Sequence, residues 1–151
     1  MINRYMFRGK RIDTGEWVQG WLLFHDIIRE HNAGLSVGTT DMSTECEFRC
    51  NAIRVDKLSI GQCTGLKDIN GVLIFDGDIF EWACSENDDK TFGPVKYGAM
   101  GNYYDDNNNA DGFIIDWEKD FALRKELGFW CSRLEIIGNI HDKNLLKEDN
   151  A

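Results

Sequence analysis

Short blocks of apolar residues separated by turn-forming residues run along most of the chain. Two such blocks, residues 5–11 and 16–24, flank Asp13-Thr14-Gly15 and predict two strands joined by a turn. In the second block, alternate residues point to opposite faces of the strand. One face would carry Trp17, Gln19, Trp21 and Leu23, and the other Val18, Gly20, Leu22 and Phe24. Because both sets are largely apolar, we expect this strand to be covered on both sides.

The stretch 61–82 combines turn chemistry with strand patterns. Asn70-Gly71 precedes the apolar run 72–75, and Asn-Gly favours a two-residue hairpin turn because both central positions need positive φ. Asp76-Gly77-Asp78 then interrupts the apolar pattern before residues 79–82 resume it. Strands that are interrupted by turns at such short intervals predict a small, strongly bent sheet. An SH3-like barrel is the fold that most commonly contains such a sheet.

The remaining pattern predicts more short strands and one helix. Residues 25–31 fit either a helical turn or a continued strand. Residues 118–127 predict a helix that Gly128 would cap at its C-terminal end. The polar run 103–111 predicts an exposed loop. Further strands are expected at 35–38, 47–58, 95–97, 112–117 and 134–140.

Several segments follow a family pattern. Residues 60–71 carry I-G-Q-x-T-G-L-K-D-x-N-G, and residues 74–79 carry I-x-x-G-D-I. Residues 5–20 look like the N-terminal strand pair of the same family, and residues 136–141 look like its closing strand. The chain thus resembles the YopX family of phage and prophage proteins over nearly its whole length.

The resemblance implies a mainly β protein with small, strongly bent sheets, an SH3-like barrel and one or two short helices. It implies a phage- or prophage-encoded protein and no particular biochemical activity. Together with the length, it predicts a single domain over residues 1–146, with its barrel-like part at roughly 53–140 and a frayed tail at 147–151. We expect a structural role for the motif residues, which are Gly61, Gln62, Thr64, Gly65, Asp68, Asn70, Gly71, Gly77, Asp78, Gly138 and Asn139.

Composition indicates a folded protein that stays in the cytoplasm of the host cell. The sequence is 42% hydrophobic and 12% aromatic, which argues against disorder. No apolar stretch approaches the ~20 residues that a membrane helix needs, and the basic start lacks an apolar segment of signal-peptide length. We therefore expect no membrane contact.

The net charge of −9 is unevenly distributed. Residues 1–75 carry nine Lys or Arg and nine Asp or Glu, whereas residues 76–151 carry eight and seventeen. Direct DNA or RNA binding is therefore disfavoured, because such binding depends on neutralising phosphates with Lys and Arg. A small basic patch near the start is interpreted as a solvated edge strand protected by charge. Its members are Arg4, Arg8, Lys10 and Arg11.

A candidate calcium loop overlaps the end of the polar run. The pattern N-x-N-x-D-G-x-I-x-x-x-E at 107–118 matches several positions of an EF-hand loop. Its first position, however, holds Asn107 in place of a carboxylate, and the preceding residues do not predict an incoming helix. A polar hairpin loop is the preferred interpretation. The alternative is Ca²⁺ binding by Asn107, Asn109, Asp111 and Glu118.

The cysteines indicate reduced thiols and no cofactor. Their number is odd, which does not fit a secreted disulfide framework. They are Cys46, Cys50, Cys63, Cys84 and Cys131. The Cys46-x-x-x-Cys50 spacing is tolerated in zinc sites, but such sites usually need two pairs, and the sequence has no second pair. Buried structural thiols are the preferred interpretation.

Three aspartates in the central stretch are the remaining candidates for catalytic residues. Asp76 and Asp78 flank Gly77, and Asp68 lies across the predicted hairpin. Paired carboxylates can act as acid and base, but Asp beside Gly or Asn more often bonds the amides of its own turn. The sequence contains no G-x-S-x-G, P-loop or dinucleotide fingerprint. We expect no catalytic residues.

These observations predict a non-enzymatic protein that binds a host or phage protein. One alternative is a nucleic-acid mimic whose carboxylates between Asp76 and Asp120 imitate phosphates and occupy a host DNA-binding protein. The other is a metal-dependent hydrolase built around Asp76, Asp78 and the loop at Asn107. Free sheet edges leave self-association open.

Overall fold

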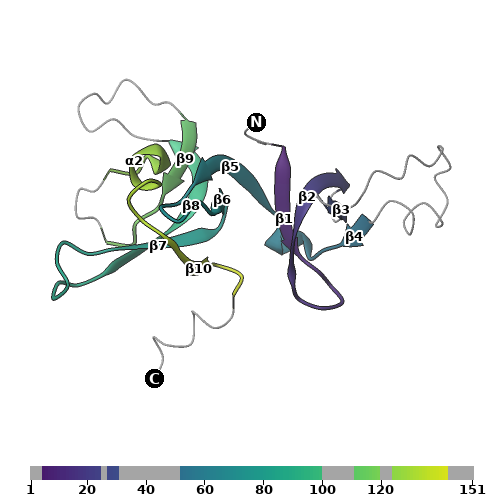
Figure 1. Cartoon of the computed structure of the whole chain (residues 1–151), viewed down its shortest axis with the longest axis horizontal. Coiled ribbons are helices and arrows are strands. Elements are labelled where there is room, and N and C mark those ends of the chain that lie inside the picture. The colour runs from purple at the N-terminus through teal and green to yellow at the C-terminus, as the bar shows by residue number, and fades with distance from the viewer. Residues whose placement is uncertain (1–4, 25–26, 31–51, 100–110, 120–123, 143–151) are drawn as a thin grey trace. The chain divides into compact units, whose positions relative to one another are not determined.

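The fold is mainly β, as the sequence predicts. A computed structural model describes residues 5–24, 27–30, 52–99, 111–119 and 124–142 (Figure 1). The elements in this part of the chain are β1 Met6–Lys10, β2 Trp17–Phe24, β3 Ile27–Glu30, β4 Ala52–Arg54, the 3-10 helix η1 Lys57–Ser59, β5 Gly61–Lys67, β6 Leu73–Phe75, β7 Asp78–Trp82, β8 Thr91–Ala99, β9 Asp111–Ile115, α2 Leu127–Trp130 and β10 Ile136–Asn139. The predicted strand at 35–38 and the first part of that at 47–58 lie outside the described residues.

The chain divides into two compact units. Unit 1 comprises residues 3–63 and unit 2 comprises residues 64–151. Strand β5 contributes to both, because its residues up to Cys63 belong to unit 1 and the others to unit 2. The single-domain prediction stays a prediction, since this division does not decide whether the units fold separately.

Unit 1 is built on an antiparallel sheet with the strand order β4-β3-β2-β1-β5. Strand β1 pairs with β2 from Met6 opposite Trp21 to Lys10 opposite Trp17. On its other side, Phe7 of β1 lies opposite Gln62 of β5. The prediction that the basic patch marks an edge strand is therefore wrong, because the chain returns and gives β1 a second neighbour.

The segment between β4 and β5 runs along this second side of β1. Val55 forms an isolated bridge with Arg11, and the Asp56 amide donates to the Lys10 carbonyl at 2.8 Å. The short η1 turn follows, and its Ser59 hydroxyl accepts the Lys10 amide at 2.7 Å. The amides that β1 presents on this side thus find partners in the returning chain.

Only one face of the β1–β2 pair is covered by the core of unit 1. Buried Val18, Ile28 and Val55 form this core, with Phe7, Leu22, Ile53 and Ile60 packed against it. On the opposite face Gln19 is exposed and Trp21 is 37% exposed. The prediction that this strand is covered on both sides is confirmed for the first face. On the second face Trp17 is half-buried, and Met6, which lies opposite Trp21, is buried.

Unit 2 contains an antiparallel sheet with the order β10-β7-β8-β9. Strand β8 is central, with Phe80 of β7 opposite its Gly93 and Ile115 of β9 opposite its Val95. Strand β10 pairs with β7 and carries an irregularity between Ile136 and Gly138. The strands predicted at 79–82, 95–97, 112–117 and 134–140 are confirmed at their centres.

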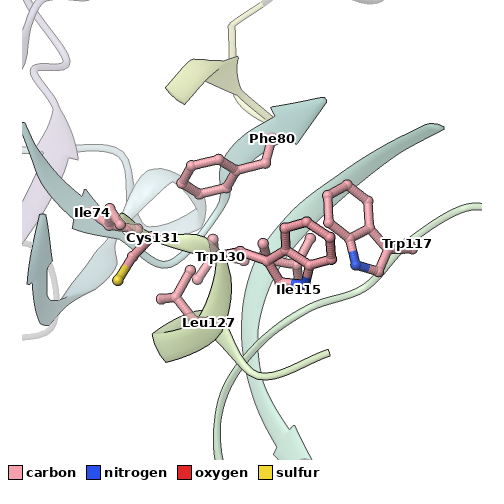
Figure 2. Close-up of a cluster of buried hydrophobic side chains, with 8 residues drawn as sticks. Ile74, Phe80, Ile115, Trp117, Leu127, Trp130 and Cys131 are labelled. Atoms are coloured by element: carbon pink, nitrogen blue, oxygen red, sulfur yellow. The ribbon is translucent and has the colours of Figure 1, made fainter. Parts of the chain in front are cut away.

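The core of unit 2 is aromatic. Figure 2 shows side chains from β6, β7, β9 and α2 gathered around Trp130. The Trp130 ring packs edge-on against Trp117 and Trp82, with centroids 5.5 and 6.0 Å away. The indole N–H groups of Trp117 and Trp130 both donate to the Arg124 carbonyl, at 3.1 and 2.6 Å. One backbone oxygen thus satisfies two largely buried donors. The buried cluster comprises Ile74, Phe80, Val95, Ile115, Trp117, Leu127, Trp130 and Cys131.

The helix predicted at 118–127 is wrong in position. The described residues before Leu127 are not helical, and Gly128 lies inside α2 rather than at its end. Tertiary pairing explains the difference. The Glu118 amide donates to the Phe92 carbonyl at 2.8 Å, and Ile114 forms an isolated bridge with Glu126. These partners hold both ends of the segment in non-helical conformations, against its helix propensity.

A closed barrel does not occur among the described residues, whereas the mainly β class is confirmed. Within the same ranges, no helix combines the length and apolar character required to cross a membrane.

The packing of β8 against β9 predicts a sharp difference between two glycines of β8. A Cβ added at Gly93 would lie 2.5 Å from Ile115 Cγ2 and 3.2 Å from the Asp116 carbonyl carbon, whereas one at Gly98 would lie 3.6 Å from Ile114 Cδ1. Gly93→Ala should therefore lower the free energy of unfolding by about 1–3 kcal/mol through overpacking. Gly98→Ala, the matched control, should change it by less than about 1 kcal/mol. Urea unfolding of both variants tests this, and equal stabilities would contradict the packing.

Candidate functional site

The central motif forms a hairpin between β5 and β6. The Gly71 amide donates to the Asp68 carbonyl at 3.0 Å, and the Asp68 amide donates to the Val72 carbonyl at 2.8 Å. The loop therefore holds three residues, Ile69, Asn70 and Gly71, with φ of 81° at Gly71. The predicted hairpin is confirmed, but the two-residue turn is wrong. A turn followed by a left-handed glycine is the usual geometry of a three-residue loop.

The Asp68 carboxylate explains this loop geometry. Its Oδ1 accepts the amides of Asn70 and Val72, both at 2.9 Å. Its Oδ2 accepts the Ile136 amide at 3.1 Å, from the start of β10. Asp68 is only 7% exposed. One buried carboxylate therefore shapes its own turn and attaches that turn to a strand 68 residues further along the chain.

Asp78 and Asn139 form a second buried network. Asp78 Oδ2 accepts the Phe75 amide at 2.8 Å, and Asp78 Oδ1 accepts the Asn139 side-chain amide at 3.1 Å. Asn139 Oδ1 in turn accepts the His141 amide at 3.0 Å. The Asp78 and Asn139 side chains, 1% and 3% exposed, thereby link the β6–β7 turn to the exit of β10.

Gly77 lies between these two segments. Its amide donates to the Val95 carbonyl at 2.8 Å, and its carbonyl accepts the Ile140 amide at 2.9 Å. Its φ is 90°, and a Cβ here would lie 3.2 Å from Asn139 Nδ2. Both the backbone conformation and the close approach require glycine.

The carboxyl group of Asp76 lies in the β6–β7 turn and has a raised pKa. Burial raises the pKa of the Asp76 carboxyl above its usual value, nearby His141 opposes the shift, and Asp78 adds to it. Asp76 is only partly buried. It is the carboxylate of this turn that solvent can reach.

This arrangement favours a structural role over catalysis. Both oxygens of Asp68 and both oxygens of Asp78 already accept hydrogen bonds from amide groups of the chain. Within the described ranges, no three His, Cys, Asp or Glu side chains are placed to hold a metal ion. Asp76 is partly buried whereas Asp78 is 1% exposed, so the two carboxylates differ in environment.

The other motif residues lie along β5 and β10. The Thr64 hydroxyl donates to the Ile74 carbonyl at 2.9 Å and accepts the Leu66 amide at 3.1 Å. Gly65 has a φ of 80°, and Gly138 adjoins the irregularity in β10. At the start of β5, Gly61 is buried and Gln62 is exposed. These residues shape the strands that carry the two aspartate networks.

The candidate calcium ligands are not brought together. Asn107 and Asn109 lie outside the described residues. Asp111 begins β9 opposite Ala99, whereas the Glu118 amide bonds the Phe92 carbonyl. Because Phe92 and Ala99 lie near opposite ends of β8, the two acidic residues are separated by a distance on the order of 20 Å. A single ion cannot contact both.

The described cysteines are free thiols. Cys63 and Cys131 are buried, and Cys84 is exposed. Cys46 and Cys50, which carry the zinc-like spacing, lie outside the described residues.

The sequence analysis missed a cluster on β1 and β2. The Arg8 guanidinium carbon lies 4.5 Å from the centroid of the Trp17 ring, and Lys10 Nζ lies 5.1 Å from it. Both cations were counted as a basic patch, and Trp17 was counted as core. Strand alternation combined with the hairpin register would have found the cluster, because Lys10 lies directly opposite Trp17.

The comparisons with known proteins give one match. The family model described as YopX protein matches residues 6–147, which is nearly the whole chain and includes both aspartate networks. No curated protein and no solved structure matches the chain.

The Asp68 network predicts a large effect of a single substitution. Asp68→Ala removes one acceptor from three backbone amides and should lower the free energy of unfolding by about 3 kcal/mol. Asp56→Ala is the matched control, because the exposed Asp56 side chain accepts one amide within the described part of the chain, that of Leu58, at 3.1 Å. Its loss should cost about 1 kcal/mol. Urea unfolding monitored by tryptophan fluorescence gives both values. Similar losses in the two variants would argue against the role of Asp68.

The raised pKa of Asp76 predicts a pH-dependent effect on stability. Because the carboxyl group binds its proton more tightly in the folded state, ionisation destabilises the fold. This contribution should be absent below about pH 4 and should grow as the pH rises through the folded-state pKa. Asp76→Asn should therefore be more stable than the wild type at about pH 7, with a smaller difference at about pH 4. Unfolding at the two pH values tests this, and a difference that grows on acidification would contradict the sign.

Proposed function

The chain belongs to the YopX family, and from that premise we propose that it is a phage- or prophage-encoded accessory protein. In this proposal it acts in the cytoplasm of the host cell, without an enzymatic activity of its own. It works by binding a host or phage protein.

The observation that carries the proposal is the use of the signature carboxylates. Asp68 and Asp78 are buried and accept amide hydrogen bonds on both of their oxygens. A carboxylate engaged in this way stabilises backbone and is poorly placed to transfer a proton or hold a metal ion. The motif that identifies the family therefore supports a scaffold for binding better than it supports a reaction centre.

The distribution of charge supports a protein partner. Unit 1 carries eight Lys or Arg and eight Asp or Glu, whereas unit 2 carries nine and eighteen. The whole net charge of −9 therefore belongs to unit 2. Such a surface opposes the phosphates of nucleic acid but can complement a protein with basic and acidic regions.

The two alternatives have weaker support. A nucleic-acid mimic needs carboxylates that are not neutralised, but Glu81 pairs with Lys90 at 2.7 Å and Asp116 pairs with Lys96 at 2.6 Å. Asp89 also lies 3.4 Å from Lys119. A hydrolase built on Asp76 and Asp78 would need both carboxylates to face a substrate, whereas Asp78 is 1% exposed.

We also propose that unit 1 is the SH3-like barrel of this protein. Its strands follow the order β4-β3-β2-β1-β5, and a 3-10 turn precedes the strand that returns to β1. The bridge between Arg11 and Val55 brings the end of β4 to β1 and supports closure. The barrel would then lie within residues 3–63 rather than at 53–140.

The proposed function predicts a specific protein partner. Tagged protein incubated with lysate of the host, with and without phage growth, should retain at least one protein that the tag alone does not retain. Mass spectrometry at low and high salt identifies it and shows how much of the binding is electrostatic. Beads that retain nothing specific from either lysate would contradict the proposal.

A further inference from the structure

The turn of the β5–β6 hairpin holds the chain's only Asn-Gly pair, Asn70-Gly71. Asparagine is a thermolabile residue, because the next backbone nitrogen can attack its side-chain amide. A glycine at that next position has no side chain to hinder the approach. Both residues are exposed, and a Cβ added at Gly71 would meet nothing within 4 Å. Steric crowding therefore does not protect this pair.

The reaction at such a pair needs no reagent other than water. The Gly71 nitrogen bonds to Cγ of Asn70, the Cγ–Nδ2 bond breaks, and ammonia leaves with the proton of the Gly71 amide. A cyclic imide remains, and water opens it at one of its two carbonyl carbons. Opening at Cγ gives aspartate. Opening at the main-chain carbon gives isoaspartate, in which the backbone runs through the former side chain.

Hydrogen bonds of the folded hairpin engage both reacting groups. The Gly71 amide, which supplies the attacking nitrogen, donates to the Asp68 carbonyl at 3.0 Å. The Asn70 side-chain nitrogen, which is the leaving group, donates to Glu135 Oε2 at 3.0 Å. The Asn70 backbone amide donates to Asp68 Oδ1 at 2.9 Å and fixes the residue between them. Cyclisation has to break these bonds, so the closed hairpin opposes it.

The charges around Asn70 oppose the same step. Attack on Cγ places negative charge on the side-chain oxygen of Asn70. The Glu135 carboxylate contacts this side chain, and the buried Asp68 carboxylate contacts the backbone of the same residue. Like charges at such short range repel each other. The closed hairpin therefore raises the barrier to ammonia loss by its charges as well as by its hydrogen bonds.

We propose that Asn70-Gly71 is a deamidation site that the closed hairpin protects and that reacts once the hairpin opens. Local opening of a turn occurs without unfolding of the whole domain. The inference goes beyond the proposed function, because it concerns the covalent chemistry of the chain and does not depend on which partner the protein binds.

The modified hairpin closes less stably than the original one. A carboxylate at position 70 cannot donate to Glu135 and repels it instead. Isoaspartate also lengthens the main chain inside a loop that the bonds between Asp68 and Val72 close tightly. Deamidation is thus an irreversible mark on chains whose hairpin has opened.

The first test compares ammonia loss in the folded and the urea-unfolded full-length protein, in the same mildly alkaline buffer. Trypsin releases residues 68–90, and mass spectrometry of this peptide measures the replacement of the Asn70 NH2 group by OH. Asn87, exposed in the same peptide, corrects for any effect of urea on the chemistry itself. Relative to Asn87, Asn70 should react at least about tenfold faster in the unfolded chain. Equal relative rates would overturn the inference.

A surface substitution tests the protection without disturbing the core. Glu135→Ala removes the acceptor of the Asn70 side chain and should speed ammonia loss in the folded protein by about fivefold. Glu135→Gln keeps an acceptor and should have a smaller effect. Glu86→Ala is the matched control, because it removes an exposed carboxylate from the loop between β7 and β8, and should leave the rate within about twofold. Equal rates in the two alanine variants would contradict the proposal.

The consequence of the modification is tested with Asn70→Asp, which reproduces one of the two products. This variant should unfold at a lower urea concentration than the wild type at neutral pH. Adding Glu135→Gln to it should restore part of the loss, because the glutamine amide can donate to the new carboxylate. A midpoint that Asn70→Asp leaves unchanged, or a loss that the second substitution does not relieve, would refute the predicted conflict with Glu135.

Discussion

Unit 2 depends on one constraint, which is that turn amides withdrawn from water need an acceptor. Asp68 meets this need for three amides at once and does so both within its own hairpin and at the start of β10. Leaving such donors without a partner costs more than a hydrogen bond gains, so the position of the carboxylate dictates where the chain can turn. Asp78 plays the same part, because its carboxylate accepts the Phe75 amide at the β6–β7 turn and the side-chain amide of Asn139. The sheet of unit 2 is therefore stabilised by side-chain hydrogen bonds at its turns as well as by the backbone hydrogen bonds between its strands.

The sequence predicted the local features that depend on a few neighbouring residues. Asn70-Gly71 indicated a hairpin, Gly77 indicated a sharp turn, and apolar alternation located most of the strands in the described part of the chain. The structural role expected of Asp68 and Asp78 stays a prediction, and the amides that they bond support it. The loop length was missed because it depends on the Asp68 side chain, whose competing hydrogen bonds selected a three-residue loop.

Features that depend on distant partners could not be predicted from one sequence. The segment 118–127 has helix-forming residues, but Phe92 and Ile114 supply hydrogen-bonding partners that keep its described ends from forming a helix. Strand β1 was interpreted as an edge because the return of residues 61–62 beside it leaves no local trace. Trp17 was interpreted as core for the same reason, since only the hairpin register shows that Arg8 and Lys10 share its face.

A family signature made of turn residues reports how the chain folds and says little about what it binds. Gly71 and Gly77 hold backbone conformations that other residues resist, and Asp68, Asp78 and Asn139 satisfy buried donors. None of these side chains extends toward solvent as a binding residue must. The residues available for recognition lie elsewhere, on faces where a charge or an aromatic ring can change without disturbing the fold. Specificity in this protein is therefore expected to reside in surfaces that the motif supports but does not encode.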